Sequence, residues 1–434
     1  MMTEFKNSAV EPPGRNLPAA YRYLSTVDVI KMTLVLVILL QKIAIPGTAS
    51  AFSFSFLVII VTIAQLMSRG MLVDIRSLMC LGGFLSVGVL SYAVVATDKF
   101  SFTSFALAAV IQSFLIFRIR LSRDDYDELL HFFVKIMIIL AFVGIIQYFS
   151  QFIVGNLAFA LDVYLPDMLL LKGFNLMNPL YYGSPTIKSN GFFFLEPSFF
   201  NQFLAVAFVA EFIRKARVAV LALFIVASVL TYSGTGLTML ALIVPYHAWR
   251  QRKFGLVALG VVGVMIAIPL GGMLELNALT DRVSEFSEKQ SSGYSRFVGV
   301  IPLLEYALHV RDGSLFFGRG PGSVQEYFLK VSFGTFDPTW GKVIYEYGLV
   351  GSLFYASLLY FAVGKGQPGL RFPLAYTYLV LGGYLLNPFI TGVMALLVVW
   401  PGTSEEAAAR APYPSPDQFE EDGRVQFRVL KARP

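Results

Sequence analysis

Apolar stretches recur along almost the whole chain, separated by short polar segments. Many of them approach the roughly 17–25 residues that a helix needs to cross a bilayer. Because these runs are continuous and do not alternate with polar residues, they indicate helices and not a transmembrane barrel. The predicted fold class is all-α, a polytopic membrane protein with about twelve transmembrane helices. The predicted spans lie at about 27–45, 51–67, 77–96, 101–117, 129–153, 197–213, 218–232, 237–249, 255–271, 341–363, 372–387 and 389–400.

Two long polar segments interrupt this pattern, at about residues 154–196 and 272–340. We interpret them as two loops on one transmembrane domain that covers residues 27–400. Residues 1–26 form a polar segment before it. Residues 401–434 form a tail rich in Pro, Glu and Ala, which we expect to be disordered.

Basic residues alternate between the two ends of the predicted spans. The short loops on the N-terminal side each hold a pair or triplet of Lys or Arg, whereas those on the opposite side hold only Lys99. Short cytoplasmic loops carry an excess of Lys and Arg, and long loops translocate largely regardless of charge. We therefore expect both termini in the cytoplasm of a bacterium and both long loops on the periplasmic face of its inner membrane.

Composition supports the membrane assignment and excludes several kinds of site. Hydrophobic residues make up 56% of the chain and charged residues 14%. The net charge of +6 lies mostly in short loops, so it reports orientation and does not indicate nucleic acid. A single cysteine, Cys80, excludes an intramolecular disulfide, and three scattered histidines give no Cys/His metal cluster. No cleavable signal peptide is evident, so the first span is expected to act as the insertion signal.

Glu196 lies where the first long loop becomes a span at Pro197. A carboxylate there is costly unless it sits at the interface or in a water-filled cavity. One interpretation is a helix-start acid that the macrodipole favours. The other is a site carboxylate that binds sugar hydroxyls or orients an arginine. For the preceding Phe192-Phe193-Phe194 we favour an aromatic belt over a face that stacks on sugars.

Arg296 and Arg319 lie on the second long loop, with small residues beside both. Solvated loop charge would explain most such arginines. The run Gly318-Arg319-Gly320-Pro321-Gly322, however, would let backbone approach a ligand closely. Guanidinium groups also suit phosphate oxygens, which they bind with two hydrogen bonds. Other basic candidates are Lys172, Lys188, Arg282 and Arg311.

Two further carboxylates lie near the end of the second loop. Asp337 begins Asp337-Pro338-Thr339-Trp340, which is typical of a helix cap or turn. Its position at a helix end near a basic loop also makes it a candidate general base. Glu346, inside the next apolar span, needs a partner, and Lys342 is available one turn earlier.

Other motifs favour plain explanations. Asp125-Tyr126-Asp127 matches the Asp-x-Asp pattern of metal-dependent glycosyltransferases, but acids at a helix start explain it better. The sequence has no Walker A glycine loop. The three histidines, His131, His247 and His309, have no partners at metal-ligand spacing. We therefore predict no cofactor and no metal.

The chain resembles the Wzy/WaaL-type group of O-antigen polymerases and ligases, and within it the xanthan-type exopolysaccharide polymerases. Residues 191–198 look like the group's Gly-x-Phe-x-Glu-Pro-Ser motif. Ser295-Arg296 followed by residues 317–322 looks like its Ser-Arg and Gly-x-Gly-x-Gly loop. Residues 340–351 look like the helix that ends in Glu-x-Gly-Leu-x-Gly. Many members carry His-Asn where this chain has Asp337-Pro338, and that His is thought to be the base in the ligases.

This resemblance implies a membrane glycosyltransferase that joins repeat units carried on undecaprenyl pyrophosphate. A carboxylate would deprotonate the acceptor hydroxyl, and arginines would stabilise the leaving pyrophosphate, so that no metal is required. Expected partners are the lipid-linked oligosaccharide, the bilayer, and the flippase and chain-length or export proteins of the same pathway. The implied catalytic residues are Glu196, Asp337 and Glu346, and the implied substrate-binding residues are Arg296, Arg319, Lys342 and Trp340.

The sequence leaves three alternatives open. A ligase that transfers finished glycan to another acceptor would share the same topology. A flippase or transporter would more often show internal repeats, and none is clear here. If Asp337 does not serve as the base, Glu196 or Glu346 does.

Overall fold

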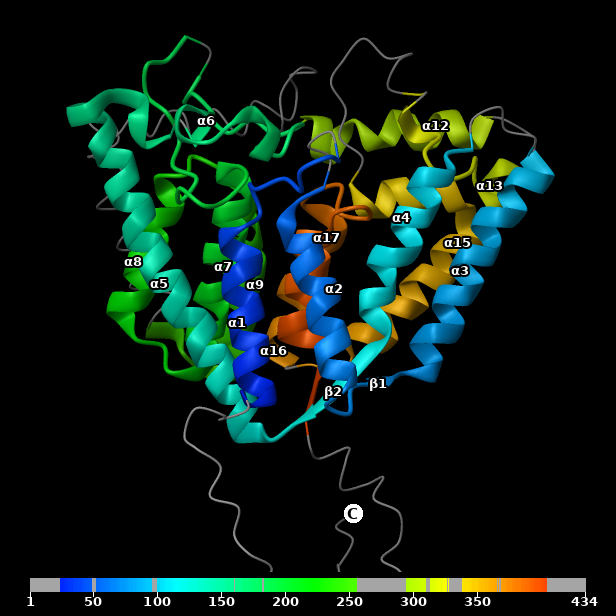
Figure 1. The fold of residues 1–434 in the computed structure, drawn as a ribbon, viewed down its shortest axis with the longest axis horizontal. Helices are drawn as coiled ribbons and strands as arrows, with labels where there is room; N and C mark the ends of the chain where they lie inside the picture. Colours follow the sequence, from blue (N-terminus) through cyan, green and yellow to red (C-terminus); the bar gives the residue numbers. More distant parts are fainter. Residues whose placement is uncertain are drawn as a thin grey trace, which may run out of the picture.

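Helices that run between two ends of the molecule dominate the fold (Figure 1). The computed structural model describes residues 24–48, 52–95, 100–159, 161–181, 183–255, 294–309, 313–325, 327, 338–364, 366 and 368–403. The helices that run between the two ends are α1 (Thr26–Leu39), α2 (Phe54–Met67), α3 (Ile75–Val95), α4 (Phe102–Ser113), α5 (Arg123–Val154), α7 (Pro197–Arg214), α8 (Val218–Val229), α9 (Gly234–Gln251), α15 (Thr339–Val363), α16 (Pro368–Val380) and α17 (Pro388–Met394).

These helices follow the predicted spans, apart from 255–271, which lies largely outside the described residues. Three segments in the described part are long and apolar enough to cross a membrane: Ile75–Val95, Arg123–Leu157 and Thr339–Val363. The helical membrane class is therefore supported, while the number of twelve spans stays a prediction.

A small sheet at one end of the bundle departs from the all-α prediction. Its strands are β1 (Leu72–Val73), β2 (Phe117–Leu121) and β3 (Pro401–Thr403), with β1 antiparallel and β3 parallel to β2. Arg118 of β2 donates hydrogen bonds to the carbonyls of Val399, Phe361 and Ala362, at 2.7, 2.9 and 3.0 Å. Because helix ends leave such carbonyls without helical partners, Arg118 ties the sheet to the ends of two helices.

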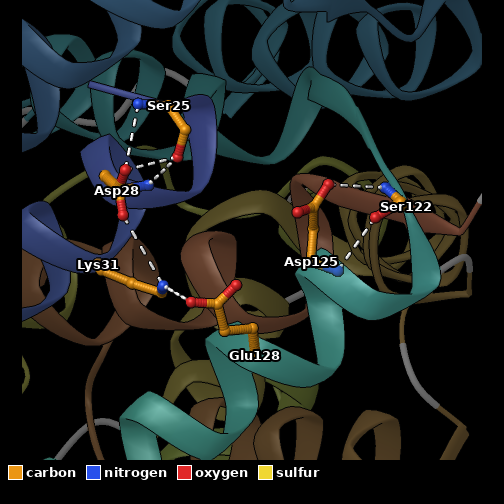
Figure 2. A network of polar contacts seen from close by, with 6 residues as sticks. All are labelled: Ser25, Asp28, Lys31, Ser122, Asp125 and Glu128. Carbon is orange, nitrogen blue, oxygen red and sulfur yellow. Dashed lines mark hydrogen bonds and ion pairs between the residues drawn. The ribbon is translucent and has the colours of Figure 1, made fainter. Parts of the chain in front are cut away.

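The starts of α1 and α5 lie side by side, as Figure 2 shows. Ser25 with Asp28 and Ser122 with Asp125 form one capping box each. Lys31 of α1 and Glu128 of α5 form an ion pair at 2.5 Å. The interpretation of the Asp-x-Asp motif as helix-start acids is thereby confirmed for Asp125, whereas Asp127 forms an ion pair with Arg214 at 2.8 Å. Within the described ranges, no three metal-ligating side chains gather in one place.

The described parts of both long polar segments lie at the end opposite this sheet (Figure 1). The first segment forms α6 (Leu161–Tyr164) between the short 3₁₀ turns Gly155–Ala158 and Asp167–Leu169. The second forms the π-helical turn η6 (Tyr294–Val298), α12 (Val300–His309) and α13 (Ser314–Phe317). We call this end the loop end. The alternation of the predicted spans between the two ends of the bundle predicted that both polar segments lie at the same end.

Helix α7 is the central element, since it is buried from Pro197 to Phe212. A helix that is apolar on every side belongs inside a bundle, and α7 packs against α5, α8, α9 and α16. Its first residue, Pro197, is therefore buried at the loop end. This places the preceding residue, Glu196, among several helices and not at the rim.

Candidate active site at the loop end

Glu196 is the N-cap of α7, but its side chain makes no capping hydrogen bond. Instead, Oε2 accepts from the Ser198 hydroxyl at 3.2 Å, and Oε1 accepts from the Asn175 backbone N–H at 3.4 Å. The side chain is half-buried. The helix-start interpretation therefore explains where Glu196 lies but leaves its carboxylate oriented by other partners.

Phe194 does not take part in the aromatic belt that the sequence favoured for residues 192–194. Phe194 is fully buried, with its ring 5.1 Å from that of Phe200 and 5.3 Å from that of Phe203. Phe192 and Phe193 are half-buried and lie edge to face at 5.1 Å. The belt prediction is wrong for Phe194 because the chain turns inward before α7 begins.

Buried amides of α5 hold that inward turn. Gln147 Oε1 accepts from the backbone N–H groups of Asn190 and Phe192, both at 3.2 Å. Its Nε2 donates to Asn190 Oδ1 at 3.0 Å. Gln151 Oε1 accepts from the Ile187 N–H at 2.8 Å. Sequence analysis missed these residues, although polar side chains inside an apolar span are a signal of function or buried structure.

Tyr384 links the start of α7 to the start of α15. Its hydroxyl donates to Gln202 Oε1 at 2.8 Å, and its backbone N–H donates to Thr339 Oγ1 at 2.9 Å. The predicted span 372–387 ends earlier than expected, because α16 stops at Val380 and the chain turns there. This turn therefore links α7, which begins directly after Glu196, to the first turn of α15.

Lys342 and Glu346 face each other on α15, with Nζ 3.8 Å from Oε1. Both are buried, and Glu346 is only 1% exposed. The expected pairing at this spacing is confirmed. Glu346 Oε1 also accepts from the Val324 backbone N–H at 3.4 Å. Trp340 packs against a separate apolar cluster under α12 that contains Val300, Leu303, Val324, Tyr327 and Tyr345.

The glycine-rich turn around Arg319 crosses α15. The Arg319 N–H donates to the Tyr345 carbonyl at 3.0 Å, and the Gly320 N–H donates to the Glu346 carbonyl at 2.9 Å. The sequence predicted close backbone approach to a ligand here, whereas the turn approaches the protein's own helix. The backbone of Arg319 is therefore held beside Glu346, and the Arg319 side chain is half-buried.

Two predicted site residues are placed less fully. Arg296 lies in η6, the turn that leads into α12, and α12 packs on α15. Asp337 lies outside the described residues, directly before Pro338, the N-cap of α15.

Helix starts converge around this site. Helices α7, α9, α15 and α17 all begin at the loop end. Thr235 in the first turn of α9 donates to the Ser198 carbonyl of α7 at 3.3 Å, and Phe389 of α17 stacks on Phe203 of α7 at 5.1 Å. Helix N-termini carry partial positive charge and stabilise anions. With Arg319 and Lys342 nearby, the loop end suits a phosphate-bearing ligand.

Comparison with known proteins identifies a family for this arrangement. Residues 26–365 match the family described as WcaD colanic acid polymerase. The match runs from the start of α1 past the end of α15, well over half of the chain. The chain matches no protein of curated function and no solved structure.

Proposed function

The chain belongs to the WcaD colanic acid polymerase family, and we propose that the loop end holds its polymerisation site. The protein is a Wzy-type polymerase of exopolysaccharide synthesis. It is an integral membrane protein that acts on lipid-linked oligosaccharides.

The proposed donor is a growing glycan on undecaprenyl pyrophosphate, and the proposed acceptor is a lipid-linked repeat unit. The convergence of helix starts with Arg319 and Lys342 supports a site for the pyrophosphate. The alternation of basic loops supports a periplasmic loop end in a bacterial inner membrane, with both termini in the cytoplasm. The flippase of the same pathway would then deliver the acceptor to that face.

The proposed reaction is a direct displacement at the anomeric carbon of the donor. The acceptor hydroxyl oxygen forms the new bond to that carbon, and the bond from the carbon to the pyrophosphate oxygen breaks. The hydroxyl proton passes to a carboxylate, and the pyrophosphate leaves with the bonding electron pair. Arg296 and Arg319 stabilise its charge, so the proposed reaction proceeds without a bound metal.

Glu196 is the described carboxylate that best fits the base. It is half-buried and accepts one hydroxyl and one long backbone hydrogen bond, so it can accept a proton from a bound hydroxyl. Glu346 fits less well, because it is almost fully buried and faces Lys342. Asp337 stays a second candidate, since it directly precedes α15 and matches the position of the base His in related ligases.

Complementation of a deletion strain tests this assignment. Glu196→Gln removes the base with little change in shape and should lower the rate by about 10²–10⁴-fold, so that single lipid-linked repeats accumulate. Asp167→Asn, at an exposed carboxylate of the same polar segment, is the matched control and should give full-length polymer. Full-length polymer from Glu196→Gln at normal protein level would remove Glu196 from the reaction. If Asp337→Asn abolishes polymer formation and Glu196→Gln does not, Asp337 is the base.

A further inference from the structure

Lys42 is a buried basic residue in the turn that follows α1. Its side chain is 3% exposed, and Nζ donates to the Phe192 carbonyl at 2.5 Å. It forms no ion pair with any described carboxylate. The sequence placed Lys42 inside the span 27–45, but α1 ends at Leu39, and so this residue lies at the loop end.

Gln41 acts on the same turn. It is 0% exposed, and its Oε1 accepts from the Leu195 backbone N–H at 3.2 Å. The Gln41 Nε2 group donates to the Ile38 carbonyl at 2.8 Å, which orients the amide. Two consecutive side chains therefore hold two backbone groups of the segment Phe192–Leu195, directly before Glu196.

The segment that they hold is conformationally strained. Gly191 and Phe192 have φ values of 64° and 62°. For a bulky residue such as Phe, this left-handed region is an outlier, which persists only when the surroundings over-determine it. Gln147 holds the Phe192 N–H from α5, and Lys42 holds the Phe192 carbonyl from the end of α1. The peptide groups on both sides of this residue are thus held by two different segments, α5 and the turn that follows α1.

Stability alone does not account for a lysine at this position. Burial of a cation without a counter-charge is unfavourable, and burial lowers the pKa of Lys42 to about 7. A methionine would fill a similar volume without that cost. The hydrogen bond to the Phe192 carbonyl is a contact that lysine supplies and methionine cannot, and it lies four residues before Glu196.

We propose that Lys42 and Gln41 are positioning residues of the polymerase, which hold the segment Phe192–Leu195 so that Glu196 faces the acceptor hydroxyl. This inference rests on the proposed role of Glu196. Neither residue touches substrate in this scheme. Their effect passes through the backbone, from the Phe192 carbonyl and the Leu195 N–H to the N-cap of α7.

Two measurements on Lys42→Met test the proposal. The first is polymer formation, which should fall on the order of 10–10²-fold at normal protein level, since a misplaced catalytic group costs that much. The second uses Glu196→Cys in a Cys80→Ser background, which removes the natural thiol. The rate at which an impermeant maleimide labels the thiol at position 196 should change when Lys42→Met is added.

Matched variants separate positioning from a general effect. Lys215→Met, the same change at an exposed lysine, should leave polymer formation unchanged. A cysteine at Tyr181, which is 57% exposed in the same polar segment, should be labelled equally with and without Lys42→Met. If Lys42→Met does not accumulate, Gln41→Met releases the Leu195 N–H and should show the same two changes.

Either of two results would overturn the proposal. One is full polymer formation by Lys42→Met, and the other is unchanged labelling at position 196 despite lost activity, which would indicate a structural role only. Failure of the proposed function gives a different result, because Glu196→Gln would then be active. The labelling rates would still report whether Lys42 sets the position of residue 196.

Discussion

Gly348 of α15 lies directly against the turn that begins at Gly318. A Cβ on Gly348 would come within 2.5 Å of the Gly318 nitrogen and 2.4 Å of the Phe316 carbonyl oxygen. Gly348 also has φ 66° and ψ −171°, which breaks the helix at this residue. Because the turn crosses at the break, the Arg319 and Gly320 N–H groups reach the carbonyls of α15.

Gly348→Ala should therefore destabilise the protein. The new Cβ meets backbone atoms that cannot move aside, and alanine is strained at this φ, so we expect a loss of about 1–3 kcal/mol. Thermal unfolding in detergent and protein level in membranes measure it. Gly82→Ala in α3 is the control, because its Cβ would meet nothing within 4 Å. A Gly348→Ala variant as stable as the Gly82→Ala variant would contradict this account of the crossing.

The helices could be predicted because their signal is local. An apolar run sets both the length and the type of element, and the starts of α5 and α7 follow from Asp125 and Pro197 at helix-start positions. The pairing of Lys342 with Glu346 was likewise predictable from helical spacing.

The remaining features depend on contacts between distant segments. Gly348 can break α15 because N–H groups of the Gly318 turn take the place of helical hydrogen-bond donors to its carbonyls. Nothing near Gly348 in the sequence reveals that turn. The end of α1 before Lys42 depends on Leu171 and Phe192, which pair with this turn from far along the chain. The short sheet likewise joins β1 and β2, which lie within the family match, to β3, which lies beyond its end.

Removal of one partner from the buried pair on α15 should be more harmful than removal of both. Lys342→Met leaves Glu346 charged and buried, which typically costs 3–5 kcal/mol. Lys342→Met with Glu346→Gln should recover part of the loss, because no isolated charge remains. Protein level and thermal unfolding of the single and double variants give the comparison. A double variant that is no more stable than Lys342→Met would mean that an uncompensated Glu346 charge is not the cause of the loss.

Arg319 should require its guanidinium group. Arg319→Ala should lower polymerisation about 10²–10³-fold, as for other groups that stabilise developing negative charge. Arg319→Lys should recover only part of this, since an ammonium cannot make the two-pronged contact. The same order is expected for Arg296. Arg120→Ala, at an exposed site on β2, is the control. Full polymer from Arg319→Ala would assign this arginine to solvated loop charge.

The loop end should be accessible from outside the cell. In a Cys80→Ser background, a cysteine at Tyr181 should react with an impermeant maleimide in intact spheroplasts, since it lies in the exposed part of the first polar segment. A cysteine at Ser68, exposed between α2 and β1, should react only after permeabilisation. The reverse pattern would invert the orientation, and the proposed site would then face the cytoplasm.

The stability of the protein should carry the signature of a buried, neutral Lys42. Burial lowers its pKa from 10.5 to about 7, so between these pH values the unfolded chain binds a proton that the folded chain has released. The free energy of unfolding contributed by this group therefore rises with pH across that window, by up to about 1.4 kcal/mol per unit.

Thermal unfolding of wild type and Lys42→Met from pH 6 to pH 9 isolates this contribution, because the other titrating groups cancel in the difference. Wild type should gain on the variant above pH 7 and not below it. A difference that stays constant with pH would mean that Lys42 keeps its proton when buried, and Lys215→Met controls for loss of a lysine charge at an exposed site.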